Sequence, residues 1–143
     1  MRKINWARLL LGGLLAGVVV NLLGWAAWIL FLGRMEAAVG ATHPPTQESA
    51  AAEVANILGS FIAGFVGVGL YVAIRPRFGP GPKTALLAGL LCWFVAGVVP
   101  MLLYMFWRGP QLPLTMIAVT FITALVLLVA GTVVGAWVYK EGG

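Results

Sequence analysis

Hydrophobic residues along the chain fall into four long runs, with polar and proline-rich breaks between them. The runs cover roughly 9–32, 54–74, 84–107 and 112–139. Each is long enough to cross a hydrocarbon core, which takes about 20 apolar residues in a helix. The pattern predicts an all-α fold with four transmembrane helices in a compact antiparallel bundle, formed as a single domain by residues 1–143.

The overall composition agrees with a membrane protein. Hydrophobic residues make up 62% of the chain and charged residues 9%, whereas soluble proteins carry about 25% charged residues. The first run follows Arg2 and Lys3, as the core of a secretory signal would. It is nevertheless longer than such a core, which has about 7–15 apolar residues, so we expect the first helix to be retained.

The distribution of cations predicts how the helices are oriented. Basic residues precede the first run and fill the break between the second and third, namely Arg2, Lys3, Arg8, Arg75, Arg77 and Lys83. The break between the first and second runs holds Arg34 together with Glu36, Glu48 and Glu53. Short basic loops stay in the cytoplasm. We therefore expect a multi-pass protein of the cell inner (plasma) membrane with both termini cytoplasmic.

Small residues form a stripe along each predicted helix and indicate where helices pack. Close backbone approach matters in lipid, because the ordinary hydrophobic reason for helices to associate is absent there. The candidate packing positions are Gly13, Gly17 and Asn21 in the first run, Ser60, Gly64 and Gly67 in the second, and Gly131 and Gly135 in the fourth. These stripes predict a bundle interior made largely of glycine, alanine and hydroxyl groups.

Polar and helix-breaking residues inside the runs are the best candidates for a functional role, since unpaired polar groups are costly in a bilayer. Asn21 is an amide near mid-span, and an interhelical hydrogen bond to Ser60 or to a freed carbonyl would explain it. Threonines in the fourth run are expected to bond carbonyls one turn earlier. Pro100 should bend the third helix and leave the Ala96 carbonyl without its usual partner.

The chain lacks the residues that most reactions require. It has one histidine, His43, and one cysteine, Cys92, which lie far apart in the sequence. These two residues cannot form a zinc or two-histidine haem site, and no nucleophile accompanies His43 and Glu48. We therefore predict no enzymatic activity, no cofactor, no metal and no nucleic-acid partner.

The breaks between the runs carry further predictions. Residues 75–84 are rich in proline and glycine and should form a compact, stiff hairpin. Its cations Arg75, Arg77 and Lys83 are candidate contacts for anionic lipid, although orientation alone would also explain them. In the outer break, Thr46 is a possible N-cap for a second helix that begins before its apolar section.

Residues 75–85, the segment 135–141 and, more loosely, the first helix resemble a family of small uncharacterised bacterial membrane proteins with four helices. That family has no assigned activity, so the resemblance implies a membrane location and four helices but no site residues. An acidic residue is expected in the first span of such proteins after the Asn21 position. Leu22, Leu23 and Gly24 stand there in this chain.

Three functional hypotheses follow from the sequence. The leading hypothesis is a non-enzymatic structural or accessory protein that associates through small-residue helix faces, as a homo-oligomer or as a subunit of a larger membrane complex. The alternative is a small oligomeric pore or carrier with a path lined by Asn21, Ser60 and the Pro100 bend. A third is an accessory protein that binds a pigment, quinone or lipid at Trp25 and Trp93.

Overall fold

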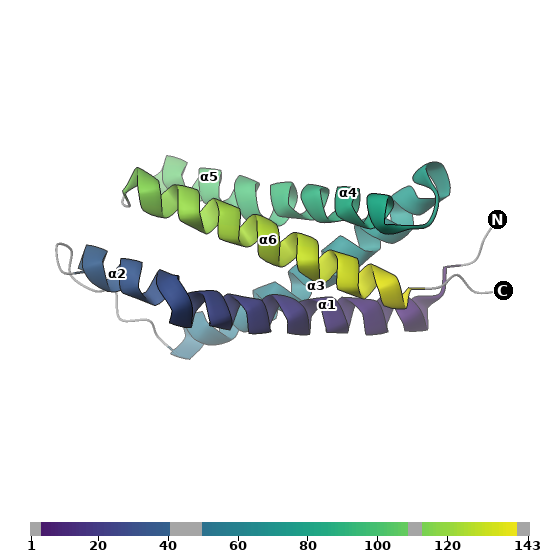
Figure 1. The fold of residues 1–143 in the computed structure, drawn as a ribbon, viewed down its shortest axis with the longest axis horizontal. Coiled ribbons are helices and arrows are strands. Elements are labelled where there is room, and N and C mark those ends of the chain that lie inside the picture. The colour runs from purple at the N-terminus through teal and green to yellow at the C-terminus, as the bar shows by residue number, and fades with distance from the viewer. Residues whose placement is uncertain (1–3, 41–49, 109–112, 140–143) are drawn as a thin grey trace.

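The computed structural model describes residues 4–40, 50–108 and 113–139, and almost all of them are helical (Figure 1). The elements are α1 (Trp6–Ala27), η1 (Trp28–Leu32), α2 (Gly33–Gly40), α3 (Ala50–Phe78), α4 (Pro82–Trp93), η2 (Phe94–Val98), α5 (Val99–Arg108) and α6 (Leu114–Val138). The short η1 and η2 are π-helical turns that continue α1 into α2 and α4 into α5.

Four helices are long and apolar enough to cross a membrane, as the sequence predicted. They cover Trp6–Val39, Ala50–Phe78, Pro82–Trp107 and Leu114–Val138. The predicted all-α fold, with four helices able to span a membrane, is therefore confirmed for the described residues. The first helix continues beyond the predicted end at residue 32, because η1 and α2 extend it without a break.

Some predictions concern residues outside the described ranges. These residues are Arg2, Lys3, His43, the proposed N-cap Thr46, Glu48 and residues 140 and 141 of the segment 135–141. Within the described part, α3 already begins at Ala50, before the apolar section that starts at residue 54. The prediction that this helix starts ahead of its apolar run is therefore confirmed.

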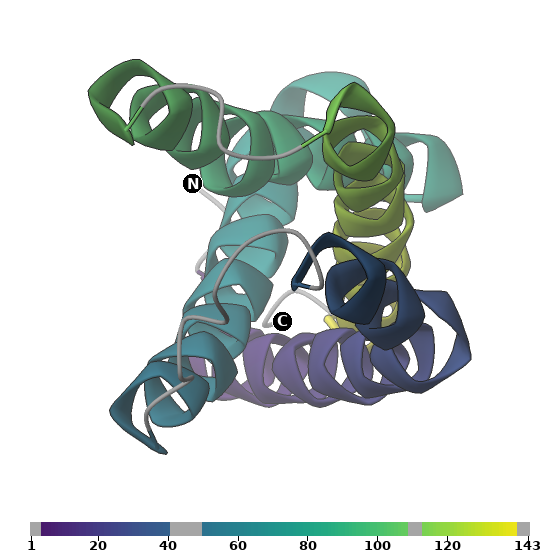
Figure 2. The ribbon, with the colours of Figure 1, turned by 90° about the vertical axis from the view of Figure 1, so that its left-hand side faces the viewer.

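The four spans pack as a ring, in which the first span and α4 lie on opposite sides of α3 and α6. The first span (α1) packs on α3 and α6, and α4 packs on the same two helices from the other side (Figure 2). α3 and α6 also contact each other across the ring. In Figure 1 the beginning of α1 and the end of α6 lie at the same end of the molecule.

Small side chains fill the interior and large apolar side chains cover the outside. Ala16, Ala88 and Cys92 are fully buried, whereas Leu22 is 63% exposed and Phe106 is 86% exposed. In water such a surface would favour aggregation. In lipid it is the expected arrangement, because hydrocarbon solvates leucine and phenylalanine and close packing selects small residues.

The connection between α3 and α4 is shorter than predicted. The sequence predicted a hairpin over 75–84, but α3 continues through Pro76 to Phe78 and α4 begins at Pro82. Pro76 lies in the last turn of α3, where its missing N–H removes only one hydrogen bond near the helix end. Pro82 occupies the first turn of α4, where the N–H would have no helical acceptor in any case.

Candidate functional site

The glycines of the first and second spans bring α1 and α3 into backbone contact. A methyl group on Gly64 would lie 2.5 Å from the Gly17 amide nitrogen and 2.7 Å from the Gly13 carbonyl oxygen. On the opposite side of this contact, Gly13 and Gly17 face the side chains of Phe65 and Phe61. No residue larger than glycine fits at position 64 unless the two helices move apart.

A second close contact joins α1 to α6. A methyl group on Gly135 would lie 2.5 Å from the Gly12 carbonyl oxygen, and one on Gly131 would lie 3.0 Å from the Ala16 carbonyl oxygen. A similar close contact joins α3 to α6, where Gly67 faces the Thr132 side chain. The predicted packing glycines therefore face other helices of the same chain, and these faces are not open to a second molecule.

The polar residues of the first and second spans bond within their own helices. The Asn21 side-chain amide donates to the Gly17 carbonyl at 2.9 Å, and the Ser60 hydroxyl donates to the Asn56 carbonyl at 3.0 Å. The expected hydrogen bond from Asn21 thus goes one turn back along α1 rather than to Ser60. Intrahelical bonds of this kind need no ligand.

The buried thiol and two threonines of α6 also have hydrogen-bond partners within the protein. Cys92 donates to the Ala63 carbonyl at 3.3 Å, and Thr120 and Thr123 donate to carbonyls one turn earlier, as predicted. In the described ranges there is no group of three histidine, cysteine or carboxylate side chains that could hold a metal ion.

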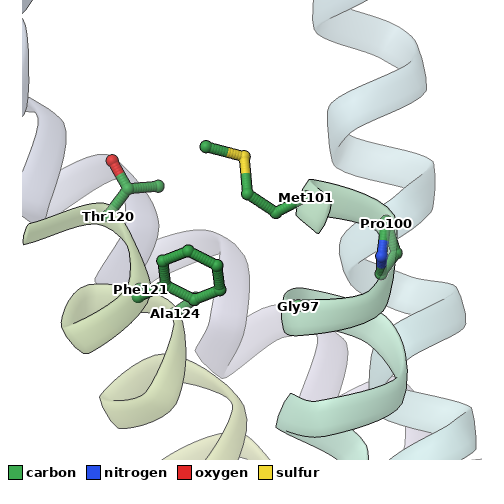
Figure 3. A pocket seen from close by; sticks show the side chains of 6 residues that line it. All are labelled: Gly97, Pro100, Met101, Thr120, Phe121 and Ala124. Carbon is green, nitrogen blue, oxygen red and sulfur yellow. The ribbon is translucent and has the colours of Figure 1, made fainter. Parts of the chain in front are cut away.

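A groove of about 440 Å³ lies between the second half of the third span and α6 (Figure 3). Its lining residues are Gly97, Pro100 and Met101 from one side and Thr120, Phe121 and Ala124 from the other. The predicted pore residues are only partly brought together, since Pro100 borders this groove and Asn21 and Ser60 do not.

Next to the groove, the third span changes its hydrogen-bond register before Pro100. In η2 the Val99 amide donates to the Phe94 carbonyl, one residue further back than in an α-helix. Pro100 lacks an N–H, so the regular ladder could not have continued through it. Beyond η2, α5 makes few contacts with the other spans, and Leu102, Phe106 and Trp107 are exposed.

Trp93 fixes one end of the groove. Its indole N–H donates to the Phe121 carbonyl at 3.1 Å, and the two rings meet edge to face with centroids 6.4 Å apart. Gly97 lies against this indole, since a methyl group there would be 3.1 Å from Trp93 Cδ1. Trp25 and Trp93, suggested by the sequence as contacts for a pigment, quinone or lipid, lie in different surroundings: Trp25 is 70% exposed on α1, whereas Trp93 packs on α6. That hypothesis stays a prediction.

The sequence did not reveal the groove as a site. Gly97 and Pro100 are three residues apart, a spacing that places them on one face of a helix. This spacing could have indicated one side of the groove. Phe121 and Ala124 belong to a different span, and nothing in their local sequence indicates that they lie opposite Pro100.

At the opposite end of the molecule, all four spans meet around Tyr71. Its buried cluster includes Ala85, Ala136 and Tyr139, with Leu9 and Ile74 packed against it. These residues come from the start of α1, the end of α3, the start of α4 and the end of α6 and its following residue. We call this set the tyrosine cluster.

Arg75 belongs to the tyrosine cluster rather than to the exposed surface. Its guanidinium carbon lies 5.8 Å from the Tyr71 ring centre and 5.5 Å from the Tyr139 ring centre. The two rings are themselves edge to face at 6.3 Å. Tyr139 is buried because it packs on Tyr71 and Arg75, whereas Trp6 and Trp137 are exposed.

Comparisons of the chain with protein-family models, with curated proteins and with solved structures gave no match. The resemblance to small four-helix membrane proteins therefore stays a prediction from the sequence.

Proposed function

We propose that the protein is a multi-pass protein of the plasma membrane, with its four spans antiparallel and both termini in the cytoplasm. The charge distribution supports this orientation. Arg8, Arg77 and Lys83 lie near the tyrosine cluster, and Glu36 and Glu53 lie on α2 and the first turn of α3 at the other end. The basic end is the cytoplasmic one.

Within that membrane, we propose a non-enzymatic accessory role in which the groove receives a transmembrane helix of a partner protein. One observation carries the proposal. The groove has three small residues in its lining, Gly97, Thr120 and Ala124, and no part of the described chain fills it, whereas the packing glycines of α1, α3 and α6 are used inside the bundle.

The chemistry of the groove suits a helix better than a polar solute. Gly97, Thr120 and Ala124 are small enough to let another backbone approach closely. The Thr120 hydroxyl already donates to the Met116 carbonyl, so it does not require a polar ligand. Leu102, Phe106 and Trp107 extend the exposed apolar face of α5 away from the groove.

The pore or carrier alternative has less support. A path within one chain would need space between the spans, but α1 approaches α3 and α6 at glycine-to-backbone distances. The amide and hydroxyl proposed to line the path, Asn21 and Ser60, both bond within their own helices.

Photo-crosslinking tests the role of the groove. A photoreactive phenylalanine analogue would replace Met101 in the groove and, as the control, Ile62, which is 63% exposed on α3. In native membranes we expect a protein adduct at position 101 and only lipid adducts at position 62. Lipid adducts alone at both positions would contradict the proposal. An adduct between two copies of this chain would show that the groove binds a second copy of the protein and would overturn the assignment to a foreign partner.

Groove-filling variants provide the second arm of this test. Thr120→Leu and Ala124→Leu place a large side chain at the groove lining, whereas Gly59→Leu places the same side chain where nothing lies within 4 Å of the glycine. We expect the Met101 adduct to be lost in the first two variants and kept in the third. Equal adduct yields in all three variants would exclude the groove as the contact.

A further inference from the structure

The turn between α3 and α4 presents an exposed basic surface. Arg77 and Lys83 flank it, both exposed, and Phe78 between them is 59% exposed. Arg8, also exposed, lies beside the tyrosine cluster residue Leu9 at the same end. Within the described ranges the carboxylates are Glu36 and Glu53, both at the opposite end of the molecule. The described surface at the basic end is therefore positive without a local counter-charge.

The turn is held in one shape by its own hydrogen bonds. The Thr84 hydroxyl donates to the Gly79 carbonyl at 2.7 Å, and the Gly81 amide donates to the Tyr71 hydroxyl at 3.4 Å. Gly79 and Gly81 have φ values of 81° and 138°, which favour glycine. A braced turn loses little conformational entropy when it binds a ligand.

Arg75 is excluded from this surface by its contacts. Its guanidinium is stacked with Tyr71 and Tyr139, and its side chain is only partly exposed. Of the three cations predicted to contact anionic lipid, the structure therefore leaves Arg77 and Lys83 exposed and assigns Arg75 to the bundle. Variants of Arg77 and Lys83 can therefore test the exposed surface without removing the buried contacts of Arg75.

We propose that the surface formed by Arg77, Phe78 and Lys83 is a docking site for the phosphate-bearing headgroup of anionic lipids. The apolar span Pro82–Trp107 begins one residue before Lys83, so this surface lies where spans leave the hydrocarbon. Cations near a membrane surface attract anionic headgroups, and an exposed aromatic ring such as Phe78 suits the interface between hydrocarbon and water. The site is separate from the groove and does not depend on a partner helix.

Lipid titration of the purified full-length protein in mild detergent tests the proposal. The probes are phosphatidylglycerol, which is anionic, and phosphatidylcholine, whose phosphate is neutralised by choline, with bound lipid counted by native mass spectrometry. We expect preference for phosphatidylglycerol. Arg77→Gln and Lys83→Gln should each weaken it roughly fivefold, and the double variant roughly 25-fold, because each removes one cation from the surface.

Arg34→Gln is the matched control, since Arg34 is an exposed cation at the opposite end of the molecule. We expect it to leave phosphatidylglycerol binding within twofold of the unmodified protein. Thermal stability should be equal in all variants, which separates lost binding from lost fold. Unchanged binding in the double variant, or an equal loss in Arg34→Gln, would overturn the proposal.

Inorganic phosphate distinguishes a lipid site from a site for a free anion. At the same concentration as the lipid, and at constant ionic strength, it should displace little phosphatidylglycerol, because the acyl chains contribute to lipid binding. Complete displacement would reassign the surface to a soluble phosphate and overturn the assignment to lipid.

Discussion

At the scale of single residues, glycine determines how close the spans come. Gly64 lies against the backbone of α1, whereas Gly59, on the same helix, has nothing within 4 Å of the position of an added methyl group. The sequence indicated that small residues form the interior, and Gly64 was among the predicted packing positions. Which glycines meet a neighbouring backbone could not be predicted, because helical spacing gives the face of a helix but not its partner.

Gly64→Ala should lower the free energy of unfolding by about 1–3 kcal/mol, the usual cost of overpacking. Gly59→Ala should leave it unchanged or raise it by up to about 1 kcal/mol, because alanine favours helix over glycine and meets no neighbour there. Unfolding in mixed micelles titrated with sodium dodecyl sulfate measures both. Equal effects at the two positions would show that α1 and α3 do not pack at Gly64.

Arg75 provides a second residue-scale test. Arg75→Gln removes the cation between Tyr71 and Tyr139, and we expect the free energy of unfolding to fall by about 1–2 kcal/mol, the scale of a partly desolvated cation–π contact. Arg77→Gln is the control, because Arg77 is exposed, and it should change stability by less than about 0.5 kcal/mol. The same micelle titration applies, and similar values for both arginines would rule out a special role for Arg75.

At the scale of elements, the sequence predicted the number of spans and their apolar cores. Its predictions of where helices end were less accurate. The connection after the second span was expected to begin at residue 75, yet α3 continues through Pro76 to Phe78. Pro100 was expected to bend the third span, and the structure has the π-turn η2 just before this proline. The second π-turn, η1, contains no proline and has no local sequence feature that would predict it.

The α3–α4 turn gives an element-scale prediction. Alanine at Gly79 would need a φ of 81°, a value that L-residues rarely adopt, at a cost of about 1–3 kcal/mol. Alanine at Gly81 would need φ near 138° with ψ 179°, a region that is essentially confined to glycine, so Gly81→Ala should cost more than Gly79→Ala. Since both glycines have open space around them, the comparison isolates backbone strain. A larger loss of thermal stability for Gly79→Ala would contradict this description of the turn.

At the scale of the whole molecule, the spans form a closed ring with one end basic and braced by the tyrosine cluster. At the other end α5 separates from its neighbours and borders the groove. The basic end could be predicted from the positions of Arg8, Arg77 and Lys83 in the sequence. The groove could not, because it depends on how η2 turns α5 relative to α6. The proposed orientation places the lipid-binding turn in the cytoplasm and the groove in the outer half of the membrane.

Cysteine labelling in intact cells tests the central claim, a four-span protein with its basic end inside. In a Cys92→Ala background, Lys83→Cys places a thiol on the basic turn and Ala37→Cys places one on the exposed surface of α2 at the opposite end. A membrane-impermeant maleimide should label position 37 in intact cells and position 83 only after the cells are permeabilised. Labelling of position 83 in intact cells would contradict the proposed arrangement of the spans.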